Sequence, residues 1–186
     1  MIPNLNVGLI HYPVLNKHRE IVTTSVTLFD IHDIARSSAT FGVNEYLIIN
    51  PSLYQKKVVD RLIHFWKQGY GKEYNDNRAV AITKVQFFFT LEEGIQYLTG
   101  SYQKKPLIVG TSAKIYSQYP GMTFPELKET LKQEPVLLLL GTGWGLSDEV
   151  LQRCDRLLEP IPGKGEYNHL SVRAAAAIML YKLMNE

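Results

Sequence analysis

The sequence predicts an α/β protein with a mainly parallel sheet and helices on both faces. Strand-like apolar segments alternate with helical segments along the whole chain, the order that parallel sheets require. Val136–Leu140 is apolar without alternation, as expected of a central strand covered on both faces. Gly141, Gly143 and Gly145 follow at once and allow a sharp turn and close approach of a ligand. Ligands of such sheets bind beyond the carboxyl ends of the strands, so we expect a binding site there.

The first half of the chain is expected to contain three strands and three helices. The strands are Leu5–Ile10, Glu45–Asn50 and Val85–Phe89, and the helices are Ile31–Phe41, Ser52–Lys67 and a short one from the Thr90–Glu93 capping box to Leu98. Gly42 ends the first helix. Val58, Leu62, Phe65 and Trp66 are expected to form the inward face of the second helix. Val22–Leu28 fits a strand or an extended loop, and Pro13–Glu20 and Gln68–Arg78 are predicted to be loops.

The second half continues the alternation, which makes residues 1–186 a single predicted domain. Its strands are Pro106–Gly110, Val136–Leu140 and Arg156–Glu159, and its helices are Phe124–Gln133, Ser147–Cys154 and Leu170–Met184. Ser147 is the expected N-cap of its helix. Ser117–Thr123 and Pro160–Glu166 are predicted loops. At 186 residues the chain has the length of one ordinary domain.

Composition excludes several classes of protein and leaves others open. A net charge of +2 gives little support for nucleic-acid binding by the chain as a whole, and its short basic clusters are typical of solvated faces. The single cysteine, Cys154, rules out an internal disulfide and is expected to be a packing residue. No apolar run is long enough for a membrane span, and no signal peptide or metal-ligand spacing is evident. We therefore expect a cytoplasmic protein without a metal.

Three segments together resemble the three motifs of the SPOUT RNA methyltransferases. They are Asp30–Gly42, Leu140–Ser147 with Leu158–Ile161, and Glu166–Ile178. The resemblance covers most of the chain and is strongest from Pro106 to the end. It is closest to a small stand-alone bacterial group that lacks an appended RNA-binding domain. Each motif alone is weak, and their order and spacing make the match specific for the superfamily.

The resemblance implies a fold, a cofactor and a quaternary structure. A deep trefoil knot would be formed by residues 135–169, and S-adenosylmethionine would lie bent within it. The enzymes of this superfamily are usually homodimers that pack through the last helix and the knot, and their substrate is RNA, here tRNA or rRNA. The implied cofactor-binding residues are Gly110, Thr111, Leu140, Gly141, Thr142, Gly143, Gly145, Leu158, Glu159, Ile161, His169, Leu170 and Ala174.

Two residues match positions that the superfamily uses for chemistry. Arg36 takes the place of the first-motif arginine, which sits at the target nucleotide in ribose methyltransferases; it would position the acceptor, or it would simply pair with Asp33 along its helix. Asn168 matches the third-motif asparagine and would contact the target, order its loop or cap the last helix. His32 and His169 are candidates for proton handling, or they are ordinary loop histidines.

Trp144 departs from the ribose-modifying pattern, which usually has an acidic residue in the second-motif turn. An indole at this position would stack on a base, cover the cofactor pocket or pack at the dimer seam. Base nitrogen and ribose 2′-oxygen therefore both remain open as the methylated atom. The main alternative to an enzyme is a non-catalytic module that binds S-adenosylmethionine and RNA. A third hypothesis is an unknotted nucleotide-binding enzyme, against which the missing dinucleotide fingerprint argues.

Overall fold

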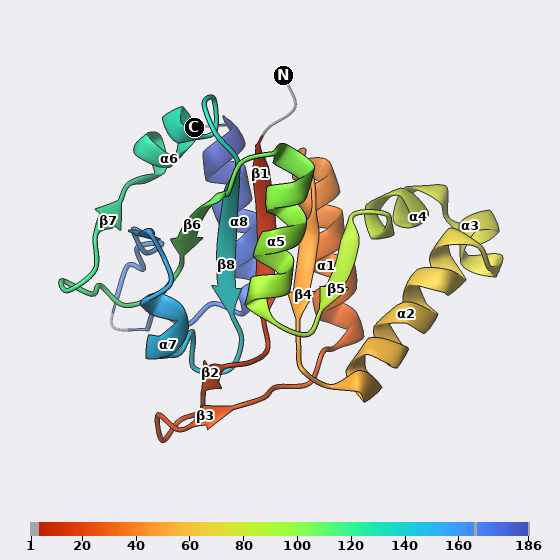
Figure 1. The fold of residues 1–186 in the computed structure, drawn as a ribbon, viewed down its shortest axis with the longest axis horizontal. Helices are drawn as coiled ribbons and strands as arrows, with labels where there is room; N and C mark the ends of the chain where they lie inside the picture. The colour runs from red at the N-terminus through yellow and green to blue at the C-terminus, as the bar shows by residue number, and fades with distance from the viewer. Residues whose placement is uncertain (1–3, 166, 186) are drawn as a thin grey trace.

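A seven-stranded parallel sheet forms the centre of the molecule (Figure 1). The computed structural model describes residues 4–165 and 167–185. The strand order is β5-β4-β1-β8-β6-β9-β7. The strands are β1 (Leu5–Ile10), β4 (Tyr46–Ile49), β5 (Val85–Phe88), β6 (Leu107–Gly110), β7 (Gly121–Met122), β8 (Val136–Gly141) and β9 (Arg156–Leu158). Two short strands, β2 (Val14–Leu15) and β3 (Ile21–Val22), form a separate antiparallel pair.

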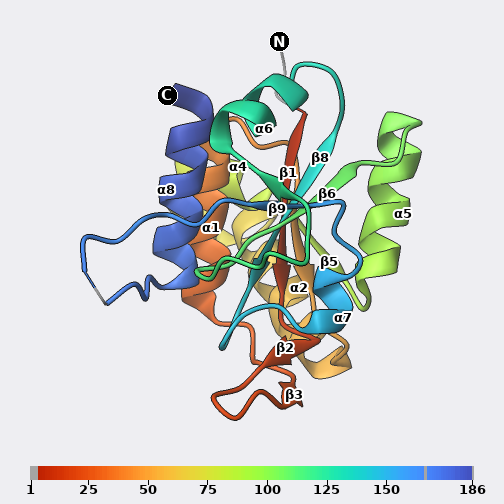
Figure 2. The ribbon, with the colours of Figure 1, turned by 90° about the vertical axis from the view of Figure 1, so that its left-hand side faces the viewer.

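Helices cover both faces of the sheet, as the sequence predicts (Figure 2). The helices are α1 (Leu28–Thr40), α2 (Leu53–Lys67), α3 (Tyr70–Tyr74), α4 (Asp76–Ile82), α5 (Leu91–Tyr102), α6 (Phe124–Thr130), α7 (Asp148–Leu151) and α8 (Val172–Asn185). One core lies under α1, α2, α4, α6 and α8, and a second core lies under α5 and α7. The two cores have the sheet between them.

The two central strands are buried, β1 over its whole length and β8 from Val136 to Leu140. β1 and β8 pair in parallel over their whole length, with Leu9 opposite Leu140. Val136 to Leu140 are all buried, and successive side chains enter the two different cores. The prediction of a strand covered on both faces is confirmed. In α1, Ile31, Ile34, Ala35 and Ser38 are buried and form the inward face of the helix.

Helix ends follow the predicted local chemistry. Gly42 lies just beyond α1 with a φ of 71°, the left-handed conformation that glycine tolerates best. Ser147 caps α7, where its Oγ accepts a hydrogen bond from Val150 N at 3.4 Å. Thr90 Oγ1 accepts from Glu93 N at 3.2 Å, but the Glu93 carboxylate accepts from Phe89 N instead of closing the box on Thr90. The capping box at α5 is therefore only half formed.

Several sequence predictions are wrong in detail. The predicted loop 68–78 contains α3 and the first three residues of α4. Two glycines and several polar residues obscure these short helices in the sequence, and α4 buries Ala79, Ala81 and Ile82. Phe65 is 43% exposed, while Val59 is buried in place of the predicted Val58. The predicted loop Pro13–Glu20 contains β2, and the predicted loop Ser117–Thr123 contains β7. Of the two alternatives for Val22–Leu28, the structure has the extended loop, because only Val22 belongs to a strand.

Each of four neighbouring parallel strands is followed immediately by a buried polar residue. His11 follows β1, Asn50 follows β4, Thr111 follows β6 and Thr142 follows β8. Parallel strands end at the same edge of a sheet, so these four side chains meet there. A group of buried polar residues at this edge is the usual location for ligand binding in an open α/β sheet.

Candidate cofactor and substrate site

A cavity of about 1010 Å³ lies at the carboxyl edge of the sheet. It is large enough for a nucleoside cofactor together with part of a substrate, since ligand pockets usually measure about 300–1,000 Å³. Its walls combine apolar side chains with backbone and a few polar groups. Lining residues include His11, Thr24, Ser25, Asp30, Thr111, Leu140, Gly141, Thr142, Gly143, Trp144, Gly145, Ile161, Asn168, His169 and Leu170.

The glycine turn after β8 is shaped by contacts that exclude side chains. A Cβ on Gly141 would lie 2.6 Å from Leu146 N, and one on Gly143 would lie 2.8 Å from Leu15 O. Gly143 and Gly145 also have φ values of 60° and 106°, which L-residues rarely adopt. The turn folds back onto β2, where Trp144 N donates to Leu15 O at 2.8 Å. Its backbone therefore lines the cavity without side chains filling it.

A chain of hydrogen bonds runs from His11 into the glycine turn. His11 Nδ1 lies 2.9 Å from Thr24 Oγ1, which lies 2.5 Å from Thr142 Oγ1. Thr142 Oγ1 in turn donates to the carbonyl oxygen of Ile10 at 3.0 Å. Asn50 Nδ2 holds the same loop by donating to Thr24 O at 3.0 Å. Residues from β1, β4 and β8 are thereby fixed relative to one another.

This chain defines the tautomer of His11. A carbonyl oxygen only accepts, so Thr142 uses its single proton on Ile10 O, and Thr24 must then donate to Thr142. Thr24 has no further proton for the ring, so His11 Nδ1 carries the hydrogen and Nε2 is the acceptor. Burial lowers the pKa of His11 to about 4, although the nearby Asp30 carboxylate works in the opposite direction. His11 is therefore a neutral acceptor near neutral pH.

The loop between β9 and α8 closes the other side of the cavity. Asn168 Nδ2 donates to Ile161 O at 3.3 Å, so Asn168 orders this loop. Asn168 does not cap α8, because Ser171 Oγ accepts from Ala174 N in that role. Ile161, His169 and Leu170 line the cavity as predicted. The exposed His169 ring packs edge-on against Tyr167 at 5.4 Å.

Four of the predicted cofactor residues lie away from the cavity. Gly110 has no room for a Cβ because Leu157 and Cys154 pack against it, so its glycine serves packing. Leu158 is only 3% exposed and belongs to the core. The Glu159 carboxylate accepts from Phe124 N at 2.8 Å and caps α6 from outside. Ala174 lies on a separate groove between α1 and α8.

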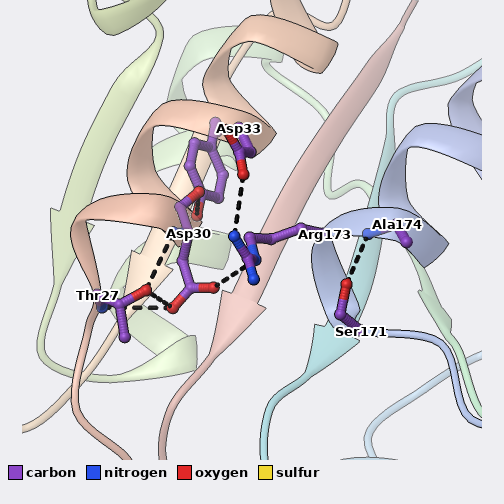
Figure 3. A network of polar contacts seen from close by, with 7 residues as sticks. Thr27, Asp30, Asp33, Ser171, Arg173 and Ala174 are labelled. Carbon is purple, nitrogen blue, oxygen red and sulfur yellow. Dashed lines mark hydrogen bonds and ion pairs between the residues drawn. The ribbon is translucent and has the colours of Figure 1, made fainter.

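Arg36 also lies on that groove and not on the main cavity. The groove measures about 540 Å³ and is lined by residues of α1 and of the first turns of α8. Figure 3 shows Arg173 of α8 reaching Asp33 and Asp30 of α1, with Nη1 of Arg173 3.0 Å from Asp33 Oδ2. Asp30 in turn closes a capping box with Thr27. Arg173, not Arg36, is the cation that Asp33 pairs with among the described residues.

Sequence reasoning missed His11, Thr24 and Asp30 as cavity residues. His11 was detectable, because it is the first polar residue after a strongly apolar strand. Thr24 lies in a segment with no clear pattern. Asp30 stands at the start of a predicted motif, but its carboxylate reaches the cavity only because α1 begins three residues earlier than the pattern suggests.

His32 and Cys154 are packing residues outside the cavity. His32 packs edge-on against Trp66 at 5.5 Å, outside the cavity, where burial first and then Arg78 lower its pKa. Burial raises the pKa of the Cys154 thiol to about 12, and its Sγ donates to Val150 O, as expected for an unreactive packing residue.

The described part of the chain contains no cluster of metal-ligating side chains. None of its helices is long and apolar enough to cross a membrane.

The cavity fits S-adenosylmethionine by its chemistry. Leu140, Ile161 and Leu170 supply apolar surface for an adenine, and the glycine turn supplies backbone groups at close range. The Asp30 carboxylate, only 8% exposed, offers a negative charge inside the cavity to a ligand that carries positive charge. The residues present therefore suit a folded sulfonium nucleoside.

The protein shares its fold with solved methyltransferase structures. The SpoU methyltransferase AviRb of Streptomyces viridochromogenes, solved in complex with AdoMet, superposes with a TM-score of 0.59 at 16% identity, over 96% of this chain and 56% of that one. The profile of a family described as SAM-dependent RNA methyltransferases matches residues 4–185. The chain belongs to this family, whose cofactor is S-adenosylmethionine. The prediction from the three motifs is confirmed.

Several relatives match nearly the whole chain. The tRNA (guanine-N(1)-)-methyltransferase of Oleidesulfovibrio alaskensis is 41% identical over 184 residues, which cover 98% of this chain and 42% of that protein. An uncharacterized protein of Aquifex aeolicus is 35% identical over 182 residues, covering 98% of this chain and 89% of that protein. The chain thus spans less than half of the first relative and most of the second.

Proposed function

We propose that this chain transfers a methyl group from S-adenosylmethionine to a nucleotide of tRNA or rRNA. The observation that carries the proposal is the cavity at the carboxyl edge of the sheet, where the glycine turn, the 161–170 loop and the His11–Thr24–Thr142 chain meet in a protein of this family. When bound, the cofactor supplies a sulfonium methyl that is already activated. The residues of the chain then have to bind, orient and exclude water.

Each wall of the cavity has a distinct part in this proposal. Thr111, Leu140, Thr142 and the glycine turn would hold the cofactor on the β6–β8 side, and Ile161 to Leu170 would close over it. Asn168 keeps the closing loop in shape through Ile161 O. Trp144, 67% exposed at the cavity, is suited to stack on a base of the RNA.

A homodimer through α8 would give Arg36 a role that a single chain does not. Arg36 lies on the α1–α8 groove, whose small residues Ala174 and Ala177 allow close packing. A second copy on this face would bring one chain's Arg36 toward its partner's cavity, where it would bind a phosphate of the target nucleotide.

We also propose that residues 135–169 form the trefoil knot of the superfamily. We further propose that the protein acts in the cytoplasm, where its tRNA or rRNA substrate is found.

The name of the O. alaskensis relative points to the N1 atom of guanine in tRNA. Because more than half of that protein lies outside the match, guanine N1 is one candidate target beside other base nitrogens and the ribose 2′-oxygen. Mass spectrometry of modified nucleosides, comparing a deletion strain of the source organism with its parent, identifies the missing modification and so the target.

Calorimetry and methyl transfer test the function directly. We expect S-adenosylmethionine and its demethylated product to bind, and labelled methyl to be transferred to total RNA from the deletion strain. Loss of methyl transfer in Arg36→Ala, with binding of S-adenosylmethionine retained, supports the proposal that the chain is an enzyme. Failure of both ligands to bind would end the proposal.

The alternative function is a module that binds S-adenosylmethionine and RNA without turnover. The position of Arg36 outside the cavity of its own chain favours this alternative. It predicts cofactor and RNA binding without any incorporated label in the wild-type protein. Analytical ultracentrifugation distinguishes the two further, because the shared site proposed above requires a dimer.

A further inference from the structure

The Nε2 atom of His11 is a buried hydrogen-bond acceptor without a partner among the described residues. The His11 side chain is 0% exposed, and its other ring nitrogen is held by Thr24 at 2.9 Å. Buried acceptors are nearly always satisfied in proteins, because an unpaired one loses its bond to water without replacement. His11 lines the cavity, so a bound ligand can supply the missing donor.

The sheet order indicates which ligand that is. The segments expected to hold the cofactor follow β6, β8 and β9, whereas His11 follows β1 on the other side of β8. His11 shares its end of the cavity with Thr24, Ser25 and Asp30. The cofactor on the β6–β9 side leaves this end to the RNA nucleotide.

We propose that His11 Nε2 accepts a hydrogen bond from an N–H or O–H group of the target nucleotide and so fixes its orientation in the cavity. The proposal rests on the function proposed above. The tautomer set by Thr24 and Thr142 leaves Nε2 without a hydrogen, so the contact selects nucleotides that present a donor. Sites of this kind discriminate strongly, because a ligand without the donor leaves a buried group unpaired.

Paired variants at position 11 test this contact. His11→Gln keeps an acceptor near the position of Nε2, and His11→Leu removes it. We expect kcat/KM for RNA to fall about 10- to 100-fold in His11→Leu and to recover in part in His11→Gln. The Kd for S-adenosylmethionine, measured by calorimetry, should stay within about twofold in both variants. A parallel loss of cofactor affinity would assign the donor to the cofactor instead, and unchanged kinetics would make His11 purely structural; either outcome overturns the proposal.

A spectroscopic readout covers the case in which His11→Leu does not fold. The imidazole ¹⁵N signals of the wild-type protein report which ring nitrogen accepts a hydrogen bond. We expect the His11 Nε2 signal, assigned with His11→Gln, to move on addition of total RNA from the deletion strain in the presence of the demethylated cofactor, and to stay in place with that cofactor alone. No movement with RNA contradicts the proposal, whereas absence of methyl transfer by the wild type concerns only the proposed function.

A second inference comes from the exposed face of α2. Tyr54, Lys57, Arg61 and His64 are all exposed and recur at intervals of three and four residues, so they form one stripe on the helix. We call them the α2 stripe. It extends about 15 Å along the helix axis, and Tyr54 is 71% exposed. The sequence alone gave no reason to distinguish these residues from a solvated surface.

Charge is concentrated in this part of the molecule. Residues 53–82 contain six Lys or Arg and three Asp or Glu, a net charge of +3, whereas the whole chain has only +2. Lys56 is paired with Asp60, but Lys57 and Arg61 form no ion pair with any residue that the structure describes. These two cations are therefore available to phosphates.

The α2 stripe begins beside the cavity. Gln55 Oε1 accepts from Val26 N at 2.8 Å, next to the cavity residue Ser25. Figure 1 shows α2 starting at the carboxyl end of β4 and leading away from the sheet toward α3 and α4. An RNA strand that enters the cavity can thus continue along the stripe.

We infer that the α2 stripe binds the RNA strand that flanks the target nucleotide. Lys57 and Arg61 would contact phosphates, and Tyr54 would stack on a base. A polyanion fits a positively charged stripe with an exposed ring. This inference also rests on the proposed function. It can be tested separately, because the affinity for RNA is measured without any methyl transfer.

Charge-matched double variants separate this stripe from general electrostatics. Lys57→Ala/Arg61→Ala should weaken the binding of total tRNA and rRNA about tenfold and reduce the dependence of log Kd on log salt by about one to two units. Lys105→Ala/Lys128→Ala removes the same charge elsewhere and should have a small effect. Equal effects of the two pairs, or none, would overturn the inference, and circular dichroism verifies that both proteins fold.

Discussion

Arg173 near the start of α8 and Asp33 in α1 form an ion pair, with Nη1 of Arg173 3.0 Å from Asp33 Oδ2, across 140 residues of sequence. The same guanidinium lies 3.8 Å from Asp30 Oδ1 and over the Phe29 ring. The contact joins the third sequence motif to the first. It also replaces the pairing of Asp33 with Arg36 that helix spacing suggests, because no such pair exists among the described residues.

Removal of either partner tests the strength of this connection. The side chains of Arg173 and Asp33 are 35% and 46% exposed, so their coupling should be at most about 1 kcal/mol. Arg173→Ala should cost more than Asp33→Ala, about 1–2 kcal/mol, because it also strips the cation from Asp30, whose side chain is 11% exposed. Urea unfolding of both single variants and the double variant measures the coupling. A larger loss in Asp33→Ala would contradict this order.

Stability should fall in mild acid because of His11. Its pKa is lowered from 6.5 to about 4 in the folded chain, so between these values the unfolded state binds more protons than the folded state. The contribution of His11 is complete above pH 6.5 and is lost as pH falls toward 4, with an upper bound of roughly 3 kcal/mol. Urea unfolding at pH 7.5 and pH 5 should show a smaller difference in His11→Gln than in the wild type. His18→Gln, at an exposed position, is the control and should leave the difference unchanged.

Alanine at two glycines should have opposite effects. Gly143→Ala places a Cβ 2.8 Å from Leu15 O in a residue with a φ of 60°, and should cost about 1–3 kcal/mol. It should also weaken cofactor binding by displacing the turn. Gly100 lies within α5, where a Cβ meets nothing within 4 Å, so Gly100→Ala should add about 0.5–1 kcal/mol. Thermal unfolding and calorimetry check both, and a stable, tightly binding Gly143→Ala protein would refute the role of the turn.

The Cys154 thiol should resist modification in the native protein. Its pKa is raised to about 12 by burial, and the thiolate is the reactive form, so alkylation at pH 8 should be on the order of 100- to 1,000-fold slower than in urea. Mass spectrometry after timed addition of iodoacetamide measures both rates. Comparable rates in the two conditions would show that the thiol is not shielded.

Much of the fold can be predicted from local sequence patterns, without knowledge of the tertiary contacts. β8 was predictable because a short run of apolar residues without alternation, followed by glycines, is typical of a strand covered on both faces. Ser147 and Gly42 mark helix ends through hydrogen bonds and backbone conformation that involve only near neighbours. The short helices α3 and α4 were missed, because their amphipathic patterns are too brief and their stability comes from packing against α2 and α1.

The cavity itself was predicted only in part. Its glycine turn and closing loop appear in the sequence as motifs, and Thr111, Thr142, Asn168 and Leu170 reach the cavity as expected. Leu158 and Glu159 belong to the second motif but face the core and α6, since Leu158 ends β9 and Glu159 directly follows it, so the strand fixes their directions. A motif gives the order of residues along the chain, whereas a side chain's direction depends on its strand or loop.

The sequence by itself determined the fold class, the family and the edge of the sheet where the cavity lies, because these depend on the order of residues and motifs along the chain. Only the tertiary structure decided that His11, Thr24 and Thr142 form one hydrogen-bonded chain and that Arg36 lies outside the cavity of its own chain. The bond between Thr24 and Thr142 alone joins residues 118 positions apart. Their geometry is set by strand order and helix packing, which no short stretch of sequence encodes.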